Sequence, residues 1–156
     1  MTTVIIIRIR GTGGVRRKTR ECLENLRLNR KHSCIIAEMN DSLKGMLTQA
    51  HDYIAWAPSD VKSVQLLLEK RGRLAGGKPL DANFYAKLNV KDAAELATAL
   101  VEGKTTPKTA FNVGGLNQIF RLAPPRKGYS SPKRPQPKGD LGLHKKGLLP
   151  LVERMV

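Results

Sequence analysis

Hydrophobic residues alternate along the first ten positions of the chain and then adopt a helical spacing. In residues 3–10 (TVIIIRIR), one side of an extended backbone holds Ile5, Ile7 and Ile9. The opposite side holds Val4 and Ile6 and ends in Arg8 and Arg10. This alternation predicts a strand with one side in the core. Over residues 15–28 the apolar positions recur every three or four residues, which predicts an amphipathic helix with a basic outer face.

The same two periodicities continue beyond this helix. They predict a β-α-β-α-β-α order, followed by a loop at residues 72–88, where glycines and one proline interrupt every pattern. A further helix is predicted from a cap at Asn89 to Gly103, and a final short helix over residues 146–155. The remaining predicted elements are strands at 33–39 and 53–57 and helices at 40–50 and 59–72.

The segment 121–156 differs from the rest in composition. It holds nine Lys or Arg residues against Asp140 and Glu153, and six prolines that prevent a long helix. Few apolar residues precede Leu141, so the segment cannot form a core of its own. We therefore expect a compact α+β core over about the first 70 residues, a smaller helical and looped part, and an extended basic arm that is ordered mainly by a partner.

The net charge of +15 over 156 residues makes a polyanion the expected partner. Nucleic acid leads this class, although a basic enzyme or a heparin-binding secreted protein agrees with the charge alone. The first ten residues place arginines where a signal peptide needs an unbroken apolar run, and no stretch approaches the roughly 20 apolar residues that span a bilayer. We expect a cytoplasmic protein without a membrane partner, in which Cys22 and Cys34 are buried thiols.

A glycine-rich segment joins the first strand to the first helix. Gly11 and Gly13 fit the first two positions of a dinucleotide-binding fingerprint, but Arg16 occupies the third glycine position. Glu38 also lies further along the chain than the acidic residue of that motif. The segment either turns the backbone without a ligand or forms an anion site, where backbone N–H groups and arginines contact a polynucleotide backbone. The second interpretation also accounts for the basic residues that follow the glycines.

No residues assemble a catalytic or metal-binding motif in the sequence. The three histidines are scattered, the two cysteines lie twelve positions apart, and the acidic residues are mostly near basic ones. We expect no catalysis, no cofactor and no metal site. Among the few aromatic residues, Tyr129 lies in a charged, proline-rich segment without core neighbours, where it either stacks on a base or stays solvated.

The order of these motifs resembles a known family. The arginine and glycine segment after the first strand, the helix end LENLRLNRKHS, and the triplet KGM at 44–46 after Asn40 and Asp41 resemble the large-subunit ribosomal protein family numbered thirty. Residues 1–58 are similar to its short bacterial members. The longer chain, with FNVGGLNQIFRLAPPRKGYS and GDLGLHKKGLLPLVERMV, resembles the archaeal form, which has a still longer eukaryotic relative numbered seven.

The resemblance implies a fold and a role. The implied α+β fold has a three-stranded antiparallel sheet, β-α-β-α-β in the order 3-1-2, with helices on one face, a small helical second part and an extended basic C-terminal arm. The implied parts are a ferredoxin-like RNA-binding core at 1–58, an extension at 59–120 and the arm at 121–156. The implied role is non-catalytic binding of large-subunit rRNA near the 5S rRNA, beside neighbouring proteins of the large ribosomal subunit. A general RNA-binding chaperone or assembly factor is the alternative.

The candidate RNA-binding residues lie in the glycine segment, the first helix and its end, the triplet and the arm. Basic side chains neutralise phosphates, and glycines let backbone N–H groups approach them. The resemblance adds Lys44 to this set and assigns Met46 to the core. The full set is Arg10, Gly11, Gly13, Gly14, Arg16, Arg17, Lys18, Arg20, Arg27, Arg30, Lys31, Lys44, Arg126, Lys127, Tyr129, Lys133, Arg134, Lys138, Lys145 and Lys146.

Overall fold

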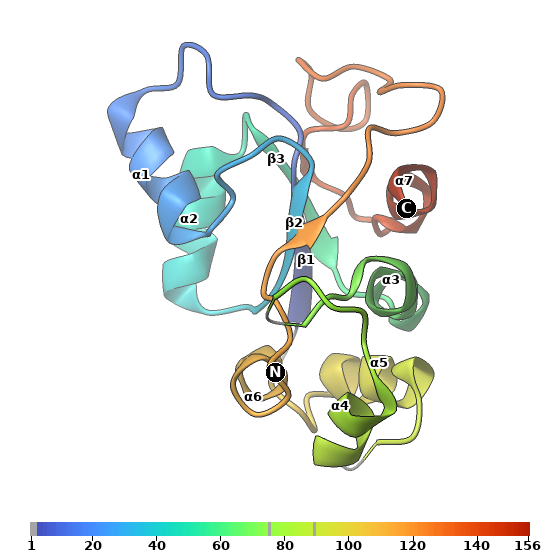
Figure 1. Ribbon diagram of the computed structural model, residues 1–156. Coiled ribbons are helices and arrows are strands. Elements are labelled where there is room, and N and C mark those ends of the chain that lie inside the picture. Colours follow the sequence, from blue (N-terminus) through green and yellow to red (C-terminus); the bar gives the residue numbers. More distant parts are fainter. Residues whose placement is uncertain (1–2, 75, 89) are drawn as a thin grey trace.

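The computed structural model describes residues 3–74, 76–88 and 90–156 and shows an α+β fold built on one mixed sheet (Figure 1). The strand order across the sheet is β4-β2-β1-β3-β5. The central strand β1 pairs antiparallel with β2 and β3, so that Ile6 lies opposite Ile35 on one side and Trp56 on the other. The strands are β1 (Thr3–Arg8), β2 (Ser33–Glu38), β3 (Ile54–Pro58), β4 (Phe120–Arg121) and β5 (Gly142–Leu143).

The sheet has five strands, so the expected number of three is wrong, and the sheet is mixed because the added strand β5 is parallel. The three predicted strands themselves are antiparallel and lie in the predicted order 3-1-2. β4 extends the edge beside β2, where Phe120 pairs with Cys34. β5 runs parallel to β3, where Gly142 pairs with Ala55. Both added strands have only two residues, which is too few for an alternating pattern to appear in the sequence. The α+β class itself is confirmed.

Helices cover both faces of the sheet, so the expectation that they lie on one face is wrong (Figure 1). α1 and α2 pack together on one face, while α3, α5 and α7 lie on the other. Within the described ranges, no helix is long and apolar enough to cross a lipid bilayer. The helices are α1 (Arg17–Asn25), α2 (Asp41–Ala50), α3 (Val61–Leu66) with its π-helical continuation η1 (Leu67–Arg71), α4 (Ala82–Lys87), α5 (Ala93–Glu102), α6 (Pro107–Asn112) and α7 (Leu149–Met155).

Two hydrophobic clusters lie on opposite faces of β1. Ile5, Ile7 and, just after the strand, Ile9 enter the larger cluster with residues from α3, η1, α5 and α7. Val4 and Ile6 enter the second cluster with side chains from α1 and α2. Because successive side chains of a strand point to opposite faces, a strand covered on both faces needs an almost unbroken apolar run. The sequence of β1 supplies that run.

Two helices have no counterpart among the predicted elements. α4 lies within residues 72–88, which the sequence pattern assigns to a loop. α6 begins at Pro107, and the side chain of Thr106 caps it. The predicted cap at Asn89 lies outside the residues that the structure describes, and α5 begins at Ala93. Both unpredicted helices have only six residues, so neither displays two full turns of periodic spacing.

The segment 121–156 is folded onto the sheet, so the expected extended arm is wrong. Its strand β5 pairs with β3, and the Ala123 N–H donates to the Met155 carbonyl oxygen at 2.9 Å. Leu151, Val152 and Met155 of α7 are buried in the larger cluster. The apolar residues near the C-terminus therefore add to a core that other segments build, although they could not form one alone.

Residues from all three expected parts of the chain share the larger cluster. Ile7 comes from the first part, Leu96 from the second and Val152 from the third. This shared core joins the three parts into one packed unit. The division at residues 58 and 120 into units that fold separately stays a prediction.

Replacement of Met155 by alanine tests whether α7 contributes to the core. Met155 is fully buried, so the variant is expected to lose about 2–5 kcal/mol of unfolding free energy through lost burial and a residual cavity. Chemical denaturation measures this loss. The exposed Glu153→Ala on the same helix is the control, and it should change the unfolding free energy by less than about 0.5 kcal/mol. Equal stability of the two variants would mean that α7 lies outside the folded core.

Candidate nucleic-acid interface

Four connecting segments meet at one end of the sheet. β1 ends where the antiparallel strands β2 and β3 begin, and β5 also begins there because it runs parallel to β3. These segments are the loop after β1, the turns before β2 and β3, and the long loop before β5 (Figure 1). We call residues 9–16, 28–32, 51–53 and 122–141, together with the first turn of α1, the basic end.

The loop after β1 presents bare backbone to solvent. Gly11, Gly13 and Gly14 are exposed, and a Cβ atom built on any of them would meet no atom within 4 Å. Gly14 has a φ of +68°, a left-handed conformation that favours glycine. Arg16 follows immediately before α1. The three predicted glycines therefore lie where a phosphate can approach the backbone, directly before the basic turn of a helix.

Arg8 anchors this loop from inside the fold. Its side chain is only 2% exposed, and its guanidinium donates to the carbonyl oxygens of Arg10 at 2.9 Å, of Gly11 at 3.0 Å, and of Leu28. Burial lowers the pKa of the Arg8 guanidinium. These contacts tie the loop after β1 to the turn before β2, so that both segments keep a fixed position.

A groove of about 650 Å³ lies between the start of α1 and the end of α2. Arg16, Arg17 and Lys18 line it, and all three are exposed. Arg20 is also exposed, further along α1. The Arg17 Nε atom lies 2.9 Å from a carboxylate oxygen of Glu21, an exposed ion pair of small energy. The structure thus brings the first four basic residues after the glycines to one groove wall or next to it.

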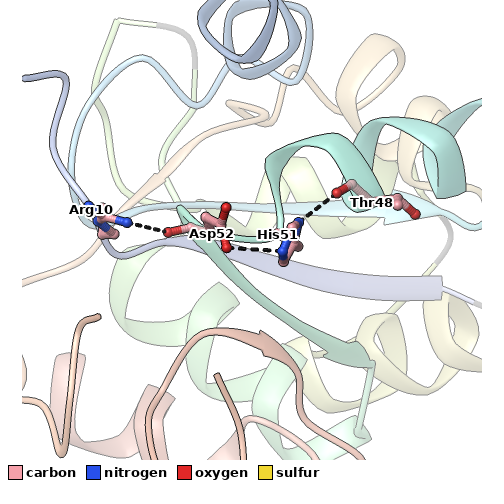
Figure 2. Close-up of polar contacts among 4 residues, drawn as sticks. All are labelled: Arg10, Thr48, His51 and Asp52. Carbon is pink, nitrogen blue, oxygen red and sulfur yellow. Dashed lines mark hydrogen bonds and ion pairs between the residues drawn. The ribbon is translucent and has the colours of Figure 1, made fainter. Parts of the chain in front are cut away.

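The turn before β3 forms the other wall of this groove. Figure 2 shows the Arg10 Nη1 atom donating to the Asp52 carbonyl oxygen at 3.3 Å. The Arg10 guanidinium also lies 4.9 Å from the centroid of the Tyr53 ring. His51 Nδ1 donates to the Thr48 carbonyl oxygen at 2.8 Å, and its Nε2 atom lies 3.0 Å from an Asp52 carboxylate oxygen (Figure 2). These contacts fix the position of Arg10 and of the groove wall.

Four further predicted basic residues lie between the end of α1 and the first turn of α2. Two of them belong to the basic end and two lie elsewhere. Arg30 and Lys31 are exposed in the turn before β2. Arg27 is exposed too, but it follows the end of α1, where it lines a different groove beside the start of α2. Lys44 is exposed near the start of α2. Met46, which we expect in the core, is half-buried and packs against the edge of the second cluster.

The long loop before β5 is organised around an internal carboxylate. The buried Asp140 side chain accepts hydrogen bonds from the backbone N–H groups of Ser130, at 2.6 Å, and Ser131, at 3.4 Å. Because these bonds turn the acidic group inward, the basic side chains of the loop define its outer charge. Lys145 and Lys146 are exposed but follow the opposite end of β5. The exposed basic residues of the loop are Arg126, Lys127, Lys133, Arg134 and Lys138.

Tyr129 is half-buried and packs against the larger cluster, so the expectation that it lacks core neighbours is wrong. Its ring stacks on His32 with 6.0 Å between centroids and 9° between planes, and its hydroxyl oxygen lies 2.8 Å from His32 Nδ1. Burial raises the pKa of Tyr129 to about 12, and burial lowers the pKa of His32. This pair fastens the long loop to the turn before β2, and stacking of Tyr129 on a base stays a prediction.

Three residues that shape the basic end are absent from the predicted set. Arg8 lies on a strand side that the pattern describes only as ending in arginine, and alternation does not separate a buried arginine from an exposed one. His32 gives no signal, because its partner lies 97 positions away. Asp140 does give one: a single acidic residue within a long basic segment indicates an internal contact.

Comparison with known proteins assigns this arrangement to a family. The family model Ribosomal protein L30p/L7e matches residues 4–54, from β1 to the start of β3. The chain is 37% identical to large ribosomal subunit protein uL30 of Archaeoglobus fulgidus, over 96% of this chain and 97% of the relative. Identity to the same-named protein of Methanocella arvoryzae is 36%, over 96% and 97%, and to that of Nanoarchaeum equitans 39%, over 83% and 81%. This chain belongs to the L30p/L7e family.

The match to the L30p/L7e family model covers three of the four segments of the basic end. Residues 4–54 contain the glycine loop, the start of α1 and the turns before β2 and β3. The long loop before β5 lies beyond this match, but it falls within the nearly full-length similarity to the archaeal uL30 proteins. The basic end therefore combines the part that the family model describes with the extension shared by the longer relatives.

Replacement of Arg8 by lysine tests whether this side chain holds the glycine loop. A lysine ammonium cannot reach three separate carbonyl oxygens as the planar guanidinium does. The unfolding free energy should fall by about 1–3 kcal/mol, because one buried and two partly buried carbonyl oxygens lose their donors. Hydrogen exchange of the amides at 10–14 should accelerate in parallel. Arg30→Lys, at an exposed position, is the control, and unchanged exchange at 10–14 in the Arg8 variant would refute the anchoring role.

The His32–Tyr129 pair should make stability depend on pH. The pKa of folded His32 lies below its ordinary value, so the unfolded chain takes up a proton at a higher pH than the folded chain. Stability from the pair is complete above the ordinary histidine pKa of about 6.5 and is lost as pH falls through the lower folded value. Denaturation at several pH values between 8 and 5 should show a smaller loss for His32→Gln than for the unmodified chain. The exposed His51→Gln is the control and should keep the original pH profile.

Proposed function

We propose that this chain is a non-catalytic structural constituent of the large ribosomal subunit and that it binds large-subunit rRNA through the basic end. The observation that carries the proposal is the convergence of four connecting segments, three of which carry exposed Lys or Arg side chains, at one end of the sheet in a chain with a net charge of +15. The archaeal relatives are named large ribosomal subunit protein uL30, which supports the ribosomal role. Ribosomal RNA is the polyanion that such a surface would meet in a ribosomal subunit.

The glycine loop and the start of α1 contact the phosphate backbone. Phosphate oxygens approach the open backbone N–H groups of Gly13 and Gly14, while Arg16, Arg17 and Lys18 add charge and bidentate hydrogen bonds. Arg8 holds the loop in place before RNA arrives, so little conformational entropy is lost on binding. These contacts recognise the position and shape of the RNA backbone, and they require no base-specific hydrogen bonds.

The long loop before β5 adds a second set of phosphate contacts from the same end of the molecule. Its five basic side chains are exposed, and the hydrogen bonds from the Ser130 and Ser131 N–H groups to Asp140 hold the loop together. Each phosphate contact should lower log affinity by about 0.7–0.9 units per decade of salt, because bound counterions are released. We infer that Lys44, Lys145 and Lys146, which lie away from the basic end, contact other parts of the rRNA.

The remaining parts of the proposal rest on the family resemblance. They are a position near the 5S rRNA, contacts to neighbouring ribosomal proteins and residence in cytoplasmic ribosomes. Cross-linking of the protein within isolated large subunits, followed by identification of the linked RNA and protein segments, tests all three together.

Charge reversal at the start of α1 tests the basic end. Changing Arg16, Arg17 and Arg20 to glutamate should spare the fold, because all three side chains are exposed. Affinity for large-subunit rRNA should fall by about 100-fold or more at moderate salt, and the salt slope should decrease by about 2–3 units for three lost contacts. Filter binding measures both quantities. The tagged variant should also leave the large-subunit peak of a sucrose gradient after a high-salt wash, whereas the unmodified protein stays there.

A second triple variant makes the comparison specific. Lys70, Lys87 and Lys91 are exposed on η1 and around α4, outside the basic end, and their change to glutamate alters the net charge equally. This control should keep most of its rRNA affinity. An equal loss in both variants would show that net charge alone drives binding, which is the behaviour of a general RNA chaperone. Recovery of the unmodified protein only at the top of the gradient would reject the ribosomal role.

A further inference from the structure

A second groove, of about 470 Å³, lies at the opposite end of the α1–α2 pair from the glycine loop. The end of α1, the last residues of β2, the start of α2, and α6 surround it, and we call it the α2–α6 groove. Leu43, Met46 and Phe111 give it an apolar wall. Met46 and Phe111 are only half-buried, although each packs against one of the two clusters. The fold therefore leaves apolar surface uncovered here.

Glu38 gives this groove a hydrogen-bonding requirement. It ends β2 and lines the groove, and its Oε1 atom is buried without a hydrogen-bond partner in the described structure. An ionised carboxylate only accepts hydrogen bonds, and a buried oxygen that lacks a donor costs free energy. Glu38 as a whole is half-buried, so a ligand that brings an N–H donor, together with a small rotation that turns the buried oxygen toward the groove, would offset this cost.

The rim of the groove is basic. Arg27, after α1, and Lys108, on α6, both line it and are both exposed. An occupant must therefore combine an apolar body, an N–H donor and a negative charge. A nucleotide has all three, because its base is flat and apolar on its faces, its exocyclic amino group donates, and its phosphate is anionic. A basic peptide would be repelled by the two rim cations. An acidic peptide segment also has backbone N–H donors, but the net charge of +15 favours RNA as the occupant.

We propose that the α2–α6 groove binds one unstacked RNA nucleotide whose base carries an exocyclic amino group. The base lies against Met46 and Phe111, its amino group donates to Glu38, and the flanking phosphates contact Arg27 and Lys108. Adenine, cytosine and guanine have such an amino group. Uracil offers only its ring N3–H, which lies between two carbonyl oxygens that repel a carboxylate, so the groove discriminates against uridine. This assignment rests on the proposed rRNA-binding function and adds recognition of a base edge to a chain whose basic end is proposed to contact mainly the RNA backbone.

Short RNAs test the groove in the full-length protein. Tetracytidine and tetrauridine are titrated separately while the Met46 methyl signal is followed by NMR. Tetracytidine should shift this signal and bind about tenfold more tightly than tetrauridine, the factor expected for one hydrogen bond to a charged group. Glu38→Gln preserves the shape but supplies an amide that pairs with either base, so the preference should fall below about twofold. Lys108→Glu, at an exposed position, should weaken the binding of both RNAs by the same factor. This variant keeps the proposal testable if the Glu38 variant does not fold.

The triple glutamate variant at Arg16, Arg17 and Arg20 separates this proposal from the proposed function. That variant should lose rRNA affinity and still prefer tetracytidine. Equal binding of the two RNAs by the unmodified protein, or an unshifted Met46 signal, would overturn the groove assignment while leaving the basic end intact. Cross-linking of the groove to a protein neighbour instead of RNA in isolated large subunits would overturn it as well.

Discussion

Burial of β1 on both faces is the constraint on which the rest of the structure depends. Val4 and Ile6 need cover from α1 and α2, while Ile5 and Ile7 need cover from helices on the opposite face. The helices α1 and α2, which cover one face, precede β3 in the sequence. The helices that cover the opposite face all follow β3. The C-terminal third of the chain therefore packs onto the sheet because a strand of this composition would otherwise expose one apolar face to water.

The same strand positions the binding surface. Arg8 at its end is a buried cation held by main-chain carbonyl oxygens, and among the residues that the structure describes no acidic side chain pairs with it. Asp140 has the reverse arrangement, a buried carboxylate held by main-chain N–H groups. Because both buried charges are balanced by backbone dipoles, neither needs a partner from the basic surface. Most of the surface charge stays available to an anionic partner, and mutual repulsion among these side chains decreases when phosphates arrive.

Sequence periodicity predicts α1, β2 and α2, because each of them is long enough to show a repeated row of buried apolar side chains. It does not predict β4, β5, α4 or α6, because two residues of strand or six of helix hold too little pattern. The expectation of helices on one face comes from the family resemblance. The alternation predicts only one buried side of β1, because the other side ends in arginine. Exposed basic residues were predictable because lysine and arginine beside glycines rarely enter a core. The contacts of Arg8, of His32 with Tyr129 and around Glu38 join distant segments, and no local pattern encodes them.

The two edge strands of the sheet have a consequence for synthesis of the chain. β4 and β5 cover the edges of β2 and β3, and both lie beyond residue 119. A strand edge without a neighbour can pair with another chain. With translation at about 5–20 residues per second, roughly 4–17 s separate the end of β3 from the start of β5. A nascent chain thus carries two open strand edges until β4 and β5 have been made, and each of these strands then pairs with two residues of the edge that it covers.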